Sequence, residues 1–117
     1  MPYARIEIAT GRSREEKRAL LATVDAAFVS TLGLPPNDAF LRLFEFAPED
    51  ALLPGHHGPR FTFVEIQLFP GRDASTKADL YRTLTDGFAA LGVPPADLII
   101  ALLEIPRPDW AVAGNAM

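Results

Sequence analysis

The sequence contains no cysteine, which excludes disulfide bonds, thiolate metal sites and cysteine nucleophiles. It also lacks any apolar run of about 18 residues, so we expect no membrane-spanning helix, no membrane partner and a cytoplasmic location. Basic residues are in the minority, because 15 Asp and Glu outnumber 11 Lys and Arg and give a net charge of −4. Without a basic stripe to meet phosphates, the composition argues against nucleic acid as the main partner.

Cofactor motifs are missing as well. The chain has no phosphate-binding loop, no nucleotide fingerprint and no Ser-His-Asp order. Its two histidines, His56 and His57, lie in a segment rich in glycine and proline without a carboxylate pair at ligand spacing. We therefore expect a solvated loop there, and neither a metal nor a cofactor.

What the sequence does contain is an internal repeat. Gly11-Arg12 recurs as Gly71-Arg72, at a spacing of 60 residues (72 minus 12). After a one-residue slip, the Leu-Gly-Leu-Pro-Pro run at 32–36 recurs as Leu-Gly-Val-Pro-Pro at 91–95. A length of 117 residues fits a single domain. We predict one domain over residues 1–117, made of repeats 2–46 and 61–105, a linker 47–60 and a C-terminal tail 106–117.

Each repeat has the pattern of a strand, a helix and a second strand. Residues 3–9 alternate between apolar and polar side chains, which is the period of a half-buried strand. Ser13 and Glu16 form a capping box that opens a helix, and Asp73 holds the capping position in the second repeat. Two fused β-α-β units predict an α/β fold: a four-stranded sheet, parallel within each unit, with two helices on one face. The uncovered face predicts burial against another subunit.

Pro2 precedes the first strand and breaks the repeat, because its counterpart 60 residues later is Thr62. If Met1 is removed, the Pro2 nitrogen becomes a secondary amine that can exchange a proton near neutral pH. The competing interpretation is an ordinary proline at the start of a strand, where its missing N–H costs nothing.

Arg12 and Arg72 each precede a predicted helix start. A guanidinium beside a helix N-terminus suits a carboxylate, which it can bind with two parallel hydrogen bonds. The competing interpretation is a solvated arginine in a turn, and the presence of one in both repeats favours a structural role for at least one of them.

These features together resemble the tautomerase superfamily: Pro2 after Met1, Gly-Arg-Ser at 11–13 followed by Glu16-Lys17, the doubled unit, and the tail Pro108-Asp109-Trp110 with Gly114-Asn115. Short members such as 4-oxalocrotonate tautomerase are single units. This chain resembles the long, fused members, including malonate semialdehyde decarboxylase and cis-3-chloroacrylic acid dehalogenase. The resemblance implies a homotrimer and an enzyme that uses an amino-terminal proline for proton transfer on a small 2-oxo or unsaturated carboxylic acid.

The resemblance also implies roles for individual residues. Arg12 matches the arginine that holds the substrate carboxylate in 4-oxalocrotonate tautomerase. Arg72 matches one of the paired arginines of the decarboxylase, whose second arginine is replaced here by Pro70. Asp38 matches the assisting aspartate of the decarboxylase, although its repeat partner Asp97 favours a turn or capping role for both.

Two aromatic residues complete the predicted site. Trp110 lies in the tail, where the family closes its site with an aromatic wall; packing at a subunit contact would also explain it. Phe40, at the start of the second predicted strand, is a weaker pocket candidate. We therefore predict Pro2, Arg72 and Asp38 as catalytic residues, and Arg12, Trp110 and Phe40 as contacts to a small carboxylate substrate.

Two other functions fit the same residues. A decarboxylase or hydratase of a short oxo-acid would use the cationic form of Pro2 with Asp38 and Arg72, whereas a tautomerase needs the neutral amine. A trimeric binding protein that kept the fold and lost catalysis is the third interpretation.

Overall fold

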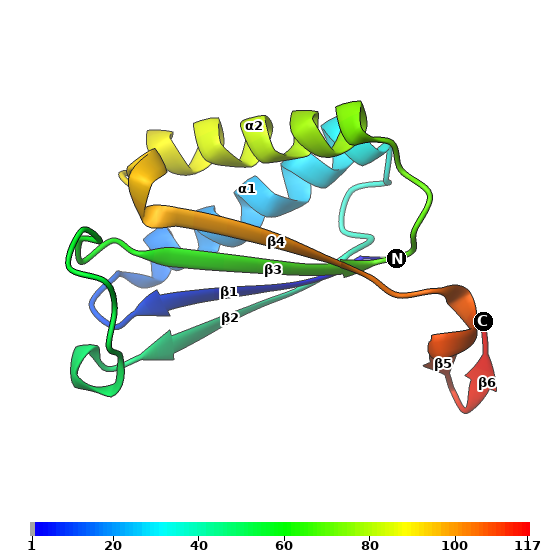
Figure 1. Ribbon diagram of the computed structural model, residues 1–117, viewed down its shortest axis with the longest axis horizontal. Coiled ribbons are helices and arrows are strands. Elements are labelled where there is room, and N and C mark those ends of the chain that lie inside the picture. The colour runs from blue at the N-terminus through cyan, green and yellow to red at the C-terminus, as the bar shows by residue number, and fades with distance from the viewer. Residues whose placement is uncertain (1) are drawn as a thin grey trace.

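The computed structural model describes residues 2–117 and consists of one four-stranded sheet with both helices on the same face (Figure 1). The strand order is β2-β1-β3-β4. Strands β1 and β2 are parallel, β3 and β4 are parallel, and β1 pairs with β3 in the antiparallel direction. The predicted α/β fold of two fused β-α-β units is therefore confirmed. The main elements are β1 (Tyr3–Ala9), α1 (Arg14–Leu32), β2 (Phe40–Phe46), β3 (Thr62–Leu68), α2 (Ala74–Ala90) and β4 (Leu98–Glu104).

Both helices begin at the predicted capping residues. The Ser13 hydroxyl accepts a hydrogen bond from the Glu16 N–H at 3.1 Å, and the Glu16 carboxylate accepts one from the Ser13 N–H at 3.4 Å. Asp73 accepts a hydrogen bond from the Thr76 N–H at 2.9 Å. Helix α1 ends at Gly33, whose φ of 69° is the left-handed conformation that glycine adopts without strain.

The core lies between the helices and the inner face of the sheet. Ile6 and Val64, from the two central strands, are completely buried. The helices cover them with apolar side chains that include Val24 on α1 and Leu84 and Phe88 on α2, each with no exposed surface. Burying one such side chain stabilises the fold by about 1.5–3 kcal/mol. This packing fixes which face of each strand is turned toward the helices.

The two units are related by an approximate internal twofold. Across the β1–β3 pair, Arg5 lies opposite Glu65, and these two residues are also repeat partners, since 65 minus 5 is 60. Each unit carries an equivalent ion pair between its helix and its outer strand: Lys17–Glu45 at 3.1 Å and Lys77–Glu104 at 2.9 Å. The start of β1 and the start of β3 consequently lie at opposite ends of the sheet.

The outer face of the sheet carries large apolar side chains in solvent. Phe40, Phe44, Ile99 and Leu103 remain 49%, 41%, 45% and 40% exposed. Arginine side chains lie over some of the rings; the Arg5 guanidinium is 4.6 Å from the centre of the Phe44 ring. Exposed apolar surface of this kind is typical of a protein–protein interface.

The segments outside the two units are short and irregular. Residues 47–60 form a loop with one 3-10 turn, η1 (Pro48–Asp50). In residues 95–97 a second 3-10 turn, η2 (Pro95–Asp97), leads into β4. The tail contains η3 (Arg107–Asp109) and a hairpin of β5 (Ala111–Val112) and β6 (Asn115–Ala116), which projects beyond the sheet at the end where the chain begins (Figure 1). Among residues 2–117, neither helix is both long and apolar enough to cross a membrane.

Candidate active site

Pro2 lies at the end of the sheet where β1 and β2 begin and where β3 and β4 finish. It is buried, and its carbonyl oxygen accepts a hydrogen bond from the Phe40 N–H at 3.0 Å. Because β1 and β3 are antiparallel, Tyr3 is paired with Gln67 near the end of β3. The topology therefore brings the segments that follow β3 and β4 to Pro2. Met1, whose removal would free the Pro2 nitrogen, lies outside the described residues.

Arg72 reaches this end of the sheet from the turn between β3 and α2. Gly71 has a φ of 125°, which an L side chain rarely adopts, and this conformation turns the chain just before Arg72. The half-buried Arg72 side chain donates from Nη1 to the Phe69 carbonyl oxygen at 3.3 Å. Within residues 2–117 no carboxylate lies at ion-pair distance from it. Arg72 thus carries a charge whose counter-ion can be a ligand.

Phe40 and Asp38 come from the start of β2. The Phe40 ring stacks on Tyr3, with ring centres 5.1 Å apart and planes 14° from parallel. Asp38 is exposed and lies two residues before the strand. The parallel pairing of Tyr3 with Phe40 sets both predicted residues at the same end of the sheet as Pro2.

Trp110 is attached to the same end by the tail. The Ile105 N–H donates to the Leu68 carbonyl at 2.8 Å, and Trp110 Nε1 donates to the Ile105 carbonyl at 2.9 Å. The Trp110 ring meets Phe69 edge-on at 5.9 Å between ring centres. The Trp110 and Phe69 rings therefore lie beside the turn that contains Arg72.

Two residues at this end were missed by the sequence reasoning. Phe69 lies between Trp110 and Arg107, whose guanidinium is 4.3 Å from the centre of the Phe69 ring. The signal that could have found Phe69 is the repeat itself, because Phe69-Pro70 replaces the Ala9-Thr10 of the first unit just as Pro2 differs from Thr62. Arg107 adds a second positive charge to the tail near the site.

Arg12 lies at the opposite end of the sheet within one chain. Arg12 follows the end of β1, and the six residue-to-residue steps from Pro2 to Ile8 alone span about 20 Å. Arg12 Nη2 donates to the Arg60 carbonyl at 3.2 Å. Burial, followed by the charge of Arg60, lowers the pKa of Arg12, and Glu16 opposes the shift. A role for Arg12 at the Pro2 site stays a prediction that would require a second chain.

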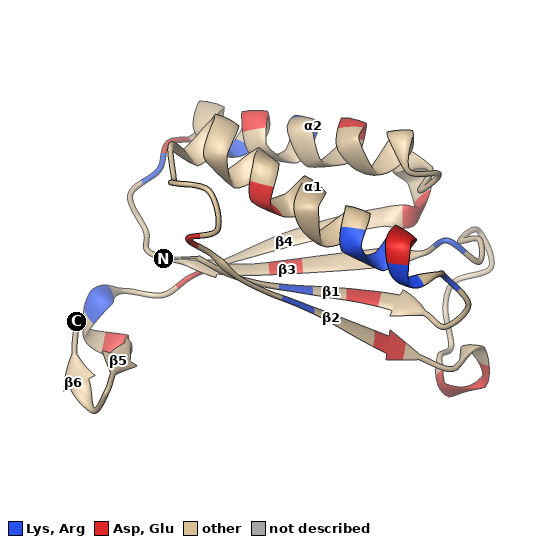
Figure 2. Ribbon diagram, turned by 180° about the vertical axis from the view of Figure 1, so that it is seen from behind, with Lys and Arg blue, Asp and Glu red and all other residues tan. Residues whose placement is uncertain are grey.

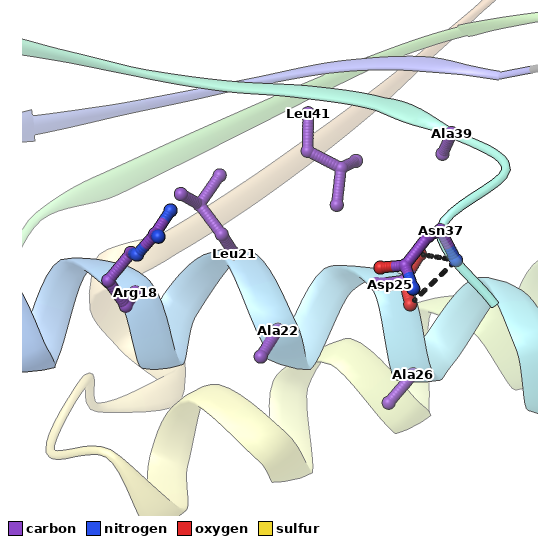
Figure 3. Close-up of a pocket in the computed structure, with 8 residues that line it drawn as sticks. All are labelled: Arg18, Leu21, Ala22, Asp25, Ala26, Asn37, Ala39 and Leu41. Atoms are coloured by element: carbon purple, nitrogen blue, oxygen red, sulfur yellow. Dashed lines mark hydrogen bonds between the residues drawn. The ribbon is translucent and has the colours of Figure 1, made fainter.

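A groove of about 490 Å³ lies elsewhere, between α1 and β2 (Figure 3). At one end of it, the two carboxylate oxygens of Asp25 accept the Asn37 N–H at 3.1 and 3.3 Å. The predicted site residues do not line this groove, so we do not assign the reaction to it. Its lining consists of Arg18, Leu21, Ala22, Asp25, Ala26, Asn37, Ala39 and Leu41.

Fold and site together define a class: an α/β protein of two fused β-α-β units, with a proline before the first strand and with an arginine and aromatic rings at the same end of the sheet. The family comparison agrees with this class. A family model described as tautomerase enzyme matches residues 40–113, and a second model with the same description matches residues 2–57. The chain belongs to the tautomerase family.

Individual relatives cover almost the whole chain. A Bacillus subtilis (strain 168) protein named "Probable tautomerase YusQ" is 25% identical over an alignment of 117 positions that covers 95% of this chain and 92% of that protein. The FG41 malonate semialdehyde decarboxylase inhibited by 3-bromopropiolate is 29% identical, with a TM-score of 0.85 over 93% of this chain and 87% of that one. A wild-type fused 4-OT described as a symmetric trimer is 30% identical, with a TM-score of 0.85 over 97% and 93%.

Proposed function

We propose that this protein is a tautomerase that uses Pro2 to move a proton on a small 2-oxo or unsaturated carboxylic acid. The observation that carries the proposal is the antiparallel pairing of β1 with β3. It brings the turn with Arg72 to the end of the sheet where Pro2 lies. A proton-transfer group and an anion-binding group at one site are the minimum that this reaction needs.

The reaction needs one proton to leave oxygen and one to reach carbon. With Met1 removed, the neutral Pro2 nitrogen takes the enol O–H proton and becomes an ammonium. The ammonium then gives a proton to the carbon of the enol double bond, the oxygen becomes a carbonyl, and the neutral amine is restored. Arg72 binds the carboxylate of the acid and stabilises the negative charge that develops on the enolate.

The aromatic residues have a separate task. Phe40 and Trp110 bound the same end of the sheet, and apolar rings beside an amine keep water out. Exclusion of water favours the neutral amine, because desolvation disfavours the charged form. The proposed reaction uses this neutral form of the amine as its base.

The assembly in the proposal is a homotrimer. Its support is the apolar outer face of the sheet, with Phe40, Phe44, Ile99 and Leu103 exposed, together with 30% identity to a fused 4-OT described as a symmetric trimer. Packing this face against two further copies would bury apolar side chains that a single chain leaves in water.

A second candidate function is favoured by one observation. The chain is 29% identical to a malonate semialdehyde decarboxylase, and Asp38 lies at the Pro2 end of the sheet. In that reaction the cationic form of Pro2 polarises the oxo-acid, and Asp38 assists it. The two functions differ in the protonation state of Pro2 that is active, which makes pH the discriminating variable.

The test is ketonisation of the enol of phenylpyruvate, followed by ultraviolet absorbance, on protein made without an amino-terminal tag and shown by intact mass to lack Met1. Pro2→Ala should reduce turnover by about 10²–10⁴-fold, which is the contribution of a positioned acid or base. Pro54→Ala, in the exposed loop at the far end of the sheet, is the matched control and should retain activity. Equal turnover by the Pro2→Ala variant would overturn the proposal.

A further inference from the structure

The internal twofold predicts that the residues at the Pro2 end of the sheet have equivalent residues at the opposite end. Because Arg5 faces Glu65 at the centre of the β1–β3 pair, the axis relates the start of β1 to the start of β3. Thr62 occupies the position equivalent to Pro2, and Arg12 occupies the position equivalent to Arg72. The far end of the sheet therefore carries residues equivalent to those of the Pro2 site, with Thr62 in place of the proline amine.

Arg12 at this far end is a half-buried cation with little negative charge nearby to neutralise it. Its Nη2 donates to a neutral partner, the Arg60 carbonyl, and its Nη1 is shielded from solvent and makes no hydrogen bond within residues 2–117. The neighbouring acid, Glu16, is already engaged by the Arg60 guanidinium at 3.1 Å and by the Ser13 N–H. Two guanidiniums therefore lie near one carboxylate, which pairs with Arg60 alone among the described residues, and the surplus positive charge favours a bound anion.

The space beside Arg12 is polar at one end and apolar at the other. A hollow of about 190 Å³ is lined by two cations and one acid, Arg12, Arg60 and Glu16, together with smaller residues. It shares Ala9, Thr10 and Pro59 with a second hollow of about 250 Å³, which is lined by apolar residues that include Phe46, Leu53 and Phe61. Figure 2 shows both basic and acidic segments at this end of the sheet, around the start of α1. An anionic head and a short apolar body would fit the two parts.

We propose that this cleft is a second binding site for a small carboxylate with an apolar tail. The carboxylate supplies the counter-ion that Arg12 lacks, and the tail enters the hollow lined by Phe46 and Phe61. The site binds without proton transfer, since the Thr62 hydroxyl, which donates to the Arg60 carbonyl at 2.9 Å, is no base near neutral pH. The capping box engages the Ser13 and Glu16 N–H groups at the start of α1, so we assign the carboxylate to the Arg12 side chain.

The test uses 3-phenylpropionate as the probe and amide chemical shifts of the intact assembly as the readout. We expect saturable shifts at Gly11 and Arg60 in the native protein. Arg12→Ala should weaken the affinity read at those amides by about tenfold or more, as expected for loss of a charge-assisted hydrogen bond. Arg14→Ala, which removes an exposed arginine outside the cleft, is the matched control and should leave the affinity unchanged.

Two further comparisons keep the result interpretable. Arg12→Lys retains the charge but not the planar fork, and it should bind with intermediate affinity even if the alanine variant unfolds. Shifts at Arg72 and Trp110 report the Pro2 site separately, so failure of the proposed catalysis leaves the shifts at Gly11 and Arg60 in place. The inference is overturned if Gly11 and Arg60 show no saturable shift, or if both Arg12 variants bind as well as the native protein.

Discussion

The Phe40 N–H donates a 3.0 Å hydrogen bond to the carbonyl oxygen of Pro2. This contact joins the first residue of the described chain to the start of β2, so Pro2 is held by two strands. Because the bond uses the carbonyl, it leaves the ring nitrogen uncommitted. In the proposed reaction, this anchor would hold Pro2 in position while its nitrogen exchanges a proton.

Replacement of Arg72 tests which group holds the carboxylate. Arg72→Ala should lower kcat/KM by about 10–100-fold, chiefly through KM, because a charge-assisted hydrogen bond contributes about 1.5–3 kcal/mol. The kcat/KM of Arg72→Lys should lie between those of the native protein and Arg72→Ala, because lysine keeps the charge but not the bidentate geometry. Steady-state kinetics on phenylpyruvate measures this, with Arg14→Ala as the exposed control. An unchanged KM in both Arg72 variants would contradict the assignment.

Asp38→Asn separates the two candidate reactions. If Pro2 acts as a neutral base, Asp38 is dispensable, and ketonisation should change by less than about tenfold, well below the contribution of a positioned acid or base. If the protein is instead a decarboxylase or hydratase, loss of this carboxylate should abolish turnover of malonate semialdehyde. The two substrates are assayed on the same variant, so one preparation decides between the functions.

Trp110 is the only tryptophan in the chain, and its emission therefore reports on the tail directly. Its indole Nε1 donates a hydrogen bond to the Ile105 carbonyl, and its ring packs on Phe69, next to the turn with Arg72. We expect 3-phenylpropionate to change the emission with a midpoint equal to its inhibition constant, and Arg72→Ala to raise that midpoint. Inhibition without any change in emission would show that Trp110 does not border the site.

The apolar outer face of the sheet predicts that a charge introduced on it will disrupt the assembly. Leu103→Glu places a carboxylate on the face that the trimer would bury, and it should convert the assembly to monomers. Leu52→Glu makes the same chemical change at a side chain that is 99% exposed, and it should leave the trimer intact. Light scattering measures both masses. A trimer that survives Leu103→Glu would mean that this face is not the interface.

Asp73 predicts a pH-dependent contribution to stability. Hydrogen bonds from Thr76 and Ser75 hold its pKa below the ordinary value of 3.8, so the ionised form is favoured in the folded state. The stabilisation is therefore fully present above the unfolded pKa and is lost as pH falls through the folded pKa. Asp73→Ala should lower Tm at neutral pH, and Asp73→Asn should lower it less, because asparagine also caps helices. The difference in Tm between native protein and Asp73→Ala should shrink as the pH is lowered toward 3; a difference that stayed constant would contradict this.

Local patterns predicted much of the fold. The alternation in β1 and the caps at Ser13 and Asp73 are properties of short segments, and the structure has them where the sequence indicated. The pairing of β1 with β3 is a long-range contact that no local pattern encodes. That pairing decides that Arg72, and not Arg12, shares an end of the sheet with Pro2 in one chain. The contact of Arg107 with Phe69 could not be predicted from a local pattern either, because it depends on how the tail folds back.

In the proposed reaction, the neutral amine of Pro2 is the active base. The most direct measurement is the pH dependence of kcat/KM for phenylpyruvate ketonisation, combined with titration of ¹⁵N-labelled Pro2 in the same protein by nuclear magnetic resonance. We predict that activity falls as pH drops through the pKa of the amine and that the two midpoints agree, because protonation removes the lone pair that accepts the proton. Activity that rises as the amine becomes protonated, or that is indifferent to its titration, would contradict the account.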